Sequence, residues 1–389
     1  MRTLLTGARI FTGDTTLDGE SLLLEGGRVL DLVAGDAAPG AREERLPEGS
    51  LLVPGFIDTQ VNGGGGVLFN DMPTVEGALA IAAAHRRFGT TALLPTFITD
   101  RPQGMRRAAE AAERAARIPG SGVLGIHLEG PFLSPARKGV HEEGAIRRPA
   151  PEDVEWLAGL PARFPEGRVL LSLAPDMVEI DDIARLAGAG LVLAGAHSAA
   201  GLERTRDALA AGLRGFTHLF NAMPPLTGRE PGIAGAALLD PGSWCGIICD
   251  GVHVHPAMLR LALALKPRGK LFLVTDAMSP TGTDATEFQL YGRTIRRQDG
   301  RLVTADGVLA GADIDMAQAV RNAVDLLGVS LEEALRMASL YPAEFLGLEA
   351  SHGRLLPGRA ADMALLSPDL RVLGTWVAGA WVRGSWQSS

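Results

Sequence analysis

Short apolar runs alternate with amphipathic segments through the middle of the chain. The segments between the runs predict helices; in TVEGALAIAAAHRRFG, for example, Thr74 can cap the start and Gly89 the end. Eight strand–helix units in one series favour a closed (β/α)8 TIM-type barrel of residues 54–349 over the alternative, a doubly wound α/β sheet. The eight predicted strands are rich in β-branched residues: FIDTQV, TALLPTF, GVLGIHLEG, RVLLSLAP, GLVLAGAHS, GFTHLFN, GIICDG and KLFLVTDA.

The two ends of the chain have a different pattern, in which short strands are separated by tight turns. The stretches EGGRV and VAGAWV, one at each end, are typical of hairpin turns. We therefore predict that residues 1–53 and 350–389 pair into one small β-sandwich domain beside the barrel.

Polar residues stand where the predicted barrel strands end. The active sites of such barrels lie at the carboxyl ends of the strands, so this pattern predicts a chemical site at that face. The residues concerned are Gln60, Glu129, His197, His218, His253 and Asp276.

Three of these residues point to a metal ion. A carboxylate in a strand as apolar as that of Glu129 is costly to bury unless it is paired or bound to a metal. His197 and His218 end successive strands, and one acid with two imidazoles is a ligand set of catalytic zinc. The alternatives are an ion pair for Glu129 and packed core histidines. We expect His127, two residues before Glu129, to be such a packed histidine.

Asp276 ends the last strand, where a carboxylate near a metal site can serve as general base. The alternative is a structural aspartate that caps the following turn. His253 and His255 look like a metal pair but follow the seventh strand, so we predict a substrate contact for His253 and no metal there.

The first strand argues for a single metal. Barrel hydrolases with two metals often carry His-x-His there and a modified lysine in the fourth strand. In this chain Gln60 and Asn62 stand at the two histidine positions of the first strand, and the predicted fourth strand, RVLLSLAP, has no lysine. Gln60 and Asn62 are therefore interpreted as a vestigial or second metal position.

Two loops add candidate substrate contacts. The loop KGVHEEGAIRRPAP contains His141 and is either a solvated connection or a substrate flap. The loop NAMPPLTGREPG brings Asn221 and Arg229 toward the same face, and the planar fork of arginine suits phosphate.

The composition narrows the class of protein. With 46% hydrophobic and 21% charged residues, the 389-residue chain is not disordered, and its net charge of −8 argues against binding nucleic acid. No apolar run approaches the roughly 18 residues of a membrane span, and the N-terminus lacks the apolar core of a signal peptide, so we expect a cytoplasmic location. Cys245 and Cys249 are predicted to be free thiols, because one strand would hold them about 13 Å apart.

Taken together, these motifs resemble the N-acetylglucosamine-6-phosphate deacetylases of the amidohydrolase superfamily, over nearly the whole chain. The stretches that carry the resemblance are PGFIDTQVNGGGG, GIHLEGPFLSPARKGVH, AGAHSAA, GFTHLFNAMPPL, DGVHVHP, LVTDAMSPTG and GRLLPGRAADMALL. The resemblance implies a barrel with a small β-sandwich. It also implies one divalent metal ion per chain, held by Glu129, His197 and His218, and the expected ion is zinc.

The resemblance further implies the roles of individual residues. Asp276 is expected to be the catalytic acid/base, and the family is typically dimeric, with Arg229 reaching the phosphate in the neighbouring subunit's site. The implied substrate contacts are Val140, His141, Asn221, Ala222, Arg229, His253 and the backbone of Leu309, Ala310 and Gly311.

The expected reaction is hydrolysis of N-acetylglucosamine 6-phosphate to glucosamine 6-phosphate and acetate. Water activated by the metal attacks the amide carbonyl, while Asp276 accepts a proton and returns it to the leaving amine. The metal and His141 stabilise the oxyanion. The alternatives are hydrolysis of another N-acyl amino sugar or of a cyclic amide, and a catalytically dead barrel that binds a sugar phosphate.

Overall fold

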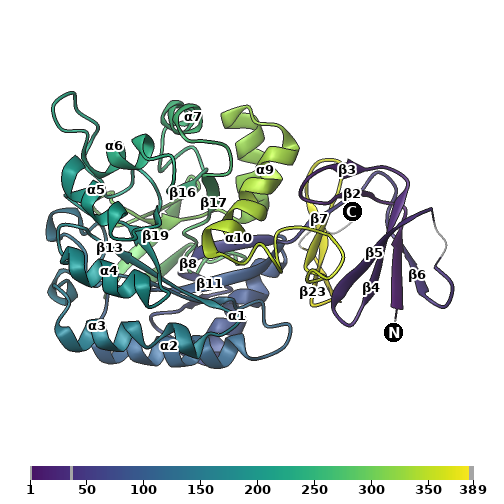
Figure 1. Ribbon diagram of the computed structural model, residues 1–389, viewed down its shortest axis with the longest axis horizontal. Helices are drawn as coiled ribbons and strands as arrows, with labels where there is room; N and C mark the ends of the chain where they lie inside the picture. The colour runs from purple at the N-terminus through teal and green to yellow at the C-terminus, as the bar shows by residue number, and fades with distance from the viewer. Residues whose placement is uncertain (1, 36–37, 385–389) are drawn as a thin grey trace.

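The computed structural model describes residues 2–35 and 38–384, and its centre is a barrel of parallel strands (Figure 1). Eight strands form one sheet in the order β17-β16-β15-β14-β13-β12-β11-β8. A parallel bridge between Val61 and Ala277 joins its two edges, so the sheet closes and the doubly wound alternative is wrong. The strands are β8 (Phe56–Val61), β11 (Thr90–Ile98), β12 (Gly125–Glu129), β13 (Arg168–Leu173), β14 (Val192–Gly195), β15 (Gly215–Phe216), β16 (Trp244–Ile248) and β17 (Leu271–Val274).

Helices surround the barrel (Figure 1). Thr74 caps the first of them as predicted, accepting a hydrogen bond from the Gly77 backbone N–H, and Gly89 follows its end with a φ of 88°. Near the end of the barrel, α9 and α10 are separate helices, because the chain breaks at Ser339. The α-helices are α1 (Val75–Arg86), α2 (Pro102–Ala116), α3 (Pro151–Ala158), α4 (Ile180–Gly188), α5 (Leu202–Ala210), α6 (Gly232–Leu239), α7 (Pro256–Leu265), α8 (Met316–Asn322), α9 (Leu331–Ala338) and α10 (Leu340–Leu346). Short 3-10 helices are η1 (Pro135–Arg137), η2 (Glu143–Ala145) and η3 (Pro161–Arg163), and η4 (Ala323–Leu327) is a π-helix.

The strands from the two chain ends form a small β domain beside the barrel, as predicted (Figure 1). One sheet has the order β5-β4-β1-β6 and the other β24-β23-β22-β7-β2-β3. Apolar side chains such as Leu22, Met363 and Trp376 are buried in one cluster. The bounds are β1 (Arg2–Thr6), β2 (Arg9–Phe11), β3 (Thr16–Leu17), β4 (Glu20–Glu25), β5 (Arg28–Ala34), β6 (Arg42–Arg45), β7 (Leu51–Pro54), β22 (Met363–Leu366), β23 (Val372–Val377) and β24 (Ala380–Arg383).

Both predicted hairpin turns are present. Gly26 and Gly27 join β4 to β5 with φ values of 58° and 76°, and Ala378 and Gly379 join β23 to β24 with 49° and 76°. Two consecutive positive φ angles match the twist of the flanking strands. The domain limits at residues 53 and 350 stay a prediction, and residues 1, 36–37 and 385–389 lie outside the described chain.

A four-stranded antiparallel sheet, absent from the sequence predictions, follows the last barrel strand. Its order is β18-β19-β20-β21, and a bridge between Ala277 and Ala312 ties it to the barrel. Its apolar side chains, with Leu68, Ile98 and Met278 of the barrel face, form a separate buried cluster. The bounds are β18 (Glu287–Leu290), β19 (Arg293–Gln298), β20 (Arg301–Val303) and β21 (Leu309–Ala312); the short pair β9 (Gly63–Gly64) and β10 (Val67–Leu68) follows β8.

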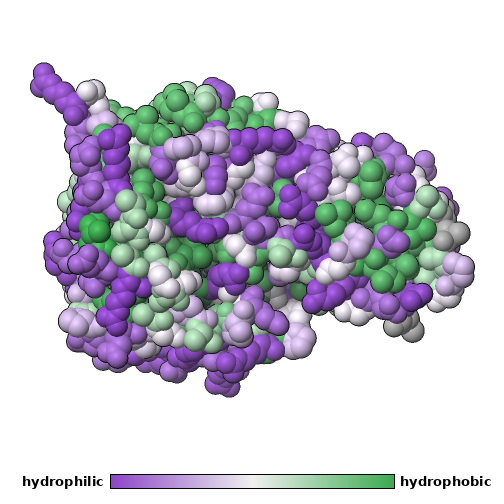
Figure 2. Space-filling view, viewed as in Figure 1, coloured by the Kyte–Doolittle hydropathy of each residue, from purple (hydrophilic) through white to green (hydrophobic). Residues whose placement is uncertain are grey.

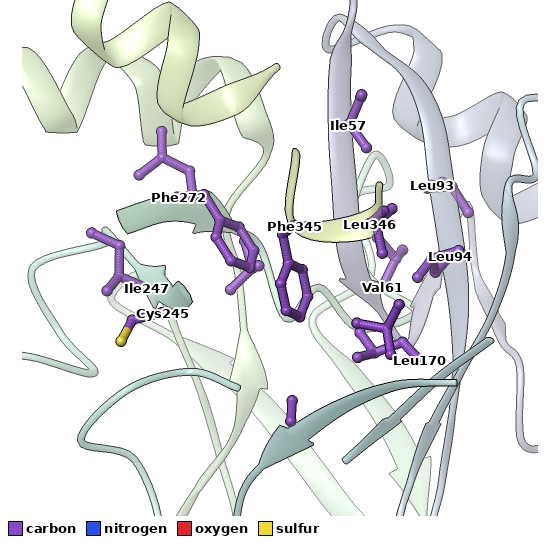
Figure 3. Packing of buried hydrophobic residues seen from close by; sticks show 14 of the residues in the cluster. Ile57, Val61, Leu93, Leu94, Leu170, Cys245, Ile247, Phe272, Phe345 and Leu346 are labelled. Carbon is purple, nitrogen blue, oxygen red and sulfur yellow. The ribbon is translucent and has the colours of Figure 1, made fainter. Parts of the chain in front are cut away.

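The amino end of the barrel is covered by α10. Phe345 stacks on Phe272 of β17 with ring centroids 5.0 Å apart (Figure 3), and Arg168, the first residue of β13, donates to the Leu346 carbonyl at 2.7 Å. These contacts leave the opposite, carboxyl end of the strands for polar side chains. Cys245 and Cys249 are buried free thiols, as predicted. Within the described chain, no helix is long and apolar enough to cross a membrane.

Candidate metal and catalytic site

Glu129, His197 and His218 meet at the carboxyl end of the barrel, as predicted. The Glu129 Oε1 atom lies 2.9 Å from His218 Nε2 and 3.3 Å from His197 Nε2, and the two Nε2 atoms are 3.1 Å apart. All three side chains are buried, with exposures between 2% and 6%. The barrel register creates this cluster, because Glu129 ends β12 while each histidine closely follows the end of a later strand, β14 or β15.

The donor set of this cluster fits a divalent cation. His197 Nδ1 lies 2.9 Å from the Arg137 carbonyl oxygen, which can only accept, so Nδ1 donates to that carbonyl while Nε2 is directed at Glu129. Two imidazole nitrogens and a carboxylate oxygen this close together repel one another unless a positive charge lies between them. One carboxylate with two imidazoles is a set that zinc uses.

The electrostatics of the cluster agree with that assignment. Burial alone would raise the pKa of Glu129, but the hydrogen bonds from His197 and His218 hold it well below its usual range. Burial alone would lower the pKa of His218, yet the Glu129 carboxylate outweighs that effect and raises it. The site therefore stabilises positive charge beside Glu129.

His141 joins this cluster from its loop. Its ring centroid is 4.4 Å from that of His197, and ligand atoms of Glu129, His141 and His197 lie within 4.8 Å of one another. His141 Nδ1 is 2.8 Å from the hydroxyl of Thr99, and burial lowers the pKa of His141 to about 3. A solvated connection is therefore wrong for this part of the loop, because His141 is only 4% exposed.

Asp276 follows β17 and lies beside the cluster of Glu129, His197 and His218. Its Oδ1 atom accepts hydrogen bonds from Asn62 Nδ2 at 2.6 Å and Gln60 Nε2 at 3.1 Å. Gln60 Nε2 also lies 3.3 and 3.4 Å from the two oxygens of Glu129, so one amide group bridges the two carboxylates. Among the described residues, the amide oxygens of Gln60 and Asn62 have no hydrogen-bond partner.

The pKa of Asp276 suits proton transfer near neutral pH. Burial and the charge of Glu129 raise the pKa to about 6, while His218, His253 and Asn62 act in the opposite direction. A group with a pKa near the working pH can both accept and return a proton.

Backbone strain marks the same residues. The backbone φ angles of three site residues lie in the left-handed region that residues other than glycine rarely adopt. They are 44° for His197, 32° for His218 and 51° for Asp276. Such strain concentrates at functional sites, where it aims side chains that a regular strand would direct elsewhere.

The predicted backbone contact at Leu309–Gly311 lies next to Asp276. The Ala312 N–H donates to the Asp276 carbonyl at 2.9 Å. Gly311 has a φ of 68°, and a Cβ atom there would lie 2.4 Å from Met278 Cγ and 2.9 Å from the Asp276 carbonyl oxygen. Only glycine allows β21 to pass this close to the site.

His253 is held by an aspartate that the sequence did not single out. Its Nδ1 atom lies 2.6 Å from Asp250 Oδ2, while Asp250 Oδ1 accepts the backbone N–H groups of Val252 and His253. His255 instead caps α7 by accepting from the Ala257 N–H. The rings of His253 and His255 therefore contact different partners, and the absence of a metal pair there stays a prediction.

The other predicted contacts occupy varied positions. Asn221 donates to the His218 carbonyl at 3.1 Å, Ala222 has a φ of 51°, and Val140 packs against the apolar cluster beneath β18–β21. Arg229 is exposed and makes no hydrogen bond or ion pair with any residue that the structure describes.

Three further residues support the site and were missed from the sequence: Thr99, Tyr291 and the buried Asp58. Thr275 Oγ1 donates to Asp58 Oδ2 at 2.5 Å, and burial raises the pKa of Asp58 to about 7. His127 contacts Thr96 and Ser172 through its two ring nitrogens and is a packed histidine, as predicted.

Comparison with known proteins agrees with this geometry. Residues 51–382 match the model of the Amidohydrolase family. The chain is 46% identical over 334 residues to an N-acetylgalactosamine-6-phosphate deacetylase of Shewanella sp. (strain ANA-3), covering 86% of this chain and 83% of the relative. It is 36% identical over 387 residues to the human N-acetylglucosamine-6-phosphate deacetylase, covering 96% and 93%.

Among solved structures, one similar fold is the crystal structure of N-acetylglucosamine-6-phosphate deacetylase from Pasteurella multocida. The TM-score is 0.94 at 34% identity, and the match covers 99% of this chain and 100% of that one.

Proposed function

The chain belongs to the amidohydrolase family, and from this premise we propose that it hydrolyses the N-acetyl amide of an N-acetylated hexosamine 6-phosphate. The products are acetate and the free amino sugar phosphate. The strongest structural support is the contact of Glu129 with His197 and His218, because these converging donors lie beside a second buried carboxylate, Asp276.

One divalent ion, zinc, would be held by Glu129, His197 and His218. Such an ion supplies Lewis acidity and lowers the pKa of a water molecule to roughly 7. Gln60 and Asn62 direct amide N–H groups at the neighbouring Asp276 carboxylate, and N–H donors do not bind cations. This orientation supports one metal ion rather than two.

Asp276 acts first as base and then as acid. Gln60 and Asn62 occupy its Oδ1 atom, which leaves Oδ2 for the proton of the attacking water. The water oxygen bonds to the amide carbon while Asp276 takes the proton. Asp276 then gives that proton to the amide nitrogen, because an amine leaves poorly unless it is protonated. The carbon–nitrogen bond breaks, and acetate and the amine separate.

His141 and the neighbouring residues bind the reacting amide and the sugar. His141 faces the cluster and donates from Nε2 to the oxygen on which negative charge develops. Substrate contacts are assigned to Val140, Asn221, Ala222, His253 and the backbone of Leu309–Gly311; of these, His253 is oriented by Asp250 and Gly311 passes beside Asp276.

The substrate is proposed to be N-acetylglucosamine 6-phosphate. A second candidate, its C4 epimer N-acetylgalactosamine 6-phosphate, is favoured by the 46% identity to a deacetylase of that name. Both sugars present the same amide and phosphate, so the site described above serves either. A dead barrel that only binds a sugar phosphate is disfavoured, because the predicted metal ligands and Asp276 are all brought together.

Acetate release tests this function directly. The enzyme is assayed with both sugar phosphates and with free N-acetylglucosamine. We expect acetate from at least one phosphosugar, a much lower kcat/KM for the free sugar, and a loss of about 10² or more in kcat for Asp276→Asn. Metal content of the variant is the control and should not change. Binding of both phosphosugars without any acetate would establish the dead barrel instead.

The partner is proposed to be a second copy of this chain. Arg229 is exposed at the loop that precedes α6 and has no partner within the described chain, so its guanidinium is available to the phosphate of a neighbouring site. Exposed leucines lie in this loop and on the helices that follow, and Figure 2 shows hydrophobic residues over α6 and α7. They are Leu226, Leu239, Leu261 and Leu265, with exposures of 37%, 60%, 40% and 50%.

Mixed dimers test the contribution of Arg229 from the second subunit. Asp276→Asn and Arg229→Ala are each expected to be weakly active alone. After unfolding and refolding together, about a quarter of all sites should combine an intact Asp276 with an Arg229 from the other subunit. Activity should rise toward that fraction with the KM of the native enzyme. A mixture no more active than its components would place Arg229 outside the site or in its own subunit's site.

The cytoplasmic location of the protein stays a prediction.

A further inference from the structure

Thr99 contacts three parts of the site at once. It follows β11 and is only 1% exposed. Its hydroxyl lies 2.8 Å from His141 Nδ1 and 3.3 Å from the Glu129 carbonyl oxygen. Its own carbonyl accepts a hydrogen bond of 2.5 Å from the Tyr291 hydroxyl. Thr99 therefore links the metal-ligand strand, the His141 loop and the β18–β21 sheet.

The single hydroxyl hydrogen of Thr99 decides what His141 presents to the substrate. A neutral imidazole has one N–H group and one acceptor nitrogen. If Thr99 donates to Nδ1, the ring hydrogen is on Nε2, which faces the metal cluster and can donate to an oxyanion. If Thr99 donates to the backbone carbonyl of Glu129 instead, His141 must donate to Thr99 from Nδ1, and its Nε2 atom then carries no hydrogen to donate. The 3.3 Å contact with the Glu129 carbonyl oxygen is long for an O–H···O hydrogen bond, whereas the 2.8 Å distance to His141 Nδ1 is normal, so the Thr99 hydrogen is better placed on His141, as in the first arrangement.

Tyr291 fixes the backbone of Thr99. It lies in the turn between β18 and β19 with a φ of 50°, in the strained left-handed region. The apolar cluster that holds this sheet includes Ile98, the residue just before Thr99. The sheet therefore positions Thr99 by a hydrogen bond and by packing.

We propose that Thr99 is a positioning residue that holds His141 in the tautomer with hydrogen on Nε2, and that Tyr291 holds Thr99 in place. This inference rests on the proposed function, in which His141 Nε2 donates to the developing oxyanion. It assigns the β18–β21 sheet a role in addition to the sugar contacts proposed for the backbone of Leu309–Gly311.

Substitutions that keep shape but change hydrogen bonding test the proposal. Thr99→Val should lower kcat about 10- to 100-fold, because His141 loses its oriented donor, while KM and metal content change little. Thr99→Ser should recover kcat to within about threefold of the native enzyme, and Tyr291→Phe should lower it less than Thr99→Val does. Thr91→Val is the matched control, since Thr91 is a buried threonine at the other end of β11, and it should leave kcat unchanged.

A spectroscopic measurement separates this proposal from the proposed function. Nitrogen-15 NMR of histidine-labelled enzyme shows which ring nitrogen of each histidine carries hydrogen, and the signal missing from His141→Gln identifies His141. The native enzyme should show hydrogen on Nε2, and Thr99→Val should show a mixture of tautomers. Hydrogen on Nδ1 in the native enzyme, or an unchanged tautomer in Thr99→Val, would overturn the proposal. A native enzyme that releases no acetate would refute the proposed function and leave the NMR result to be judged alone.

Discussion

Replacing Asn62 by leucine should weaken catalysis through a single hydrogen bond. Asn62 Nδ2 donates to Asp276 Oδ1 at 2.6 Å in a site where Asn62 is only 2% exposed. Its amide oxygen has no partner among the described residues, so Asn62→Leu removes this bond and breaks no other made by that side chain. Leucine has nearly the same shape, which limits any effect on packing.

The size of the effect follows from the charge on Asp276. A hydrogen bond to a charged group contributes about 1.5–3 kcal/mol, and each 1.36 kcal/mol corresponds to a tenfold change in rate. Gln60 still donates to the same oxygen at 3.1 Å, so the carboxylate does not lose all of its support. We therefore expect kcat/KM to fall about 10- to 100-fold at neutral pH.

The pH–rate profile shows in which direction the pKa of Asp276 moves when Asn62 is replaced. The bond from Asn62 lowers the pKa of Asp276, so its removal must raise that pKa further above the usual value. Asp276 works as a base only when it is ionised. The acid limb of the pH–rate profile should therefore move to higher pH, and the loss of rate should be larger at pH 6 than at pH 9.

A double-mutant cycle provides the assay and the refutation. Initial rates of acetate release are measured from pH 5 to 9 for the native enzyme, Asn62→Leu, Asp276→Asn and the double variant. Without the carboxylate, Asn62→Leu should cost less than about threefold. A full effect in the Asp276→Asn background, or an acid limb that stays in place, would show that Asn62 acts on something other than Asp276.

Three further predictions concern charge, burial and the metal. Arg229→Lys should raise KM for the phosphosugar about tenfold with kcat retained, because a point charge cannot replace the planar fork; an unchanged KM in steady-state assays would remove Arg229 from phosphate binding. The folded-state pKa of Asp58 is raised to about 7, so its ionisation costs stability progressively as pH rises above the unfolded value near 4 and up to about 7. Asp58→Asn should therefore raise Tm more at pH 8 than at pH 5 in thermal unfolding, and an equal gain at both values would contradict the pKa shift. Chelation should lower the Tm of the native enzyme, since a bound ion stabilises the folded state, and should change the Tm of Glu129→Gln far less; equal shifts for both would place the ion elsewhere.

The cluster of Glu129, His197 and His218 could be predicted because its residues are unusual where they occur. Glu129 ends a strand that is buried along its whole length, and an unpaired carboxylate there is costly. His197, His218 and Asp276 follow strands whose carboxyl ends meet in any barrel. The residue type and the periodicity of the strands together gave the correct neighbours.

Thr99 and Asp250 could not be found in the same way. Threonine after a strand and aspartate in a loop are common, and nothing local distinguishes these two from others. Their importance lies in the partners that the fold brings to them, His141 for one and His253 for the other. Such contacts depend on side-chain directions that periodicity does not specify.

The β18–β21 sheet was missed although the sequence carried a signal for it. Asp299 and Gly300 join β19 to β20 with φ values of 49° and 71°, the geometry that an Asp-Gly pair favours in a two-residue hairpin. The flanking strands are largely polar, because the sheet is exposed on one side, so their apolar runs are short. The turn pair was the better indicator there.

Metal stoichiometry tests the central claim most directly. Protein freed of metal is titrated with zinc, and bound zinc and acetate release from the preferred phosphosugar are measured on the same samples. We expect no acetate without the ion, followed by activity that rises in proportion to bound zinc and saturates near one ion per chain. Saturation near two ions per chain would show that Gln60 and Asn62 help to hold a second metal. Full activity without any divalent ion would contradict the account of Glu129, His197 and His218.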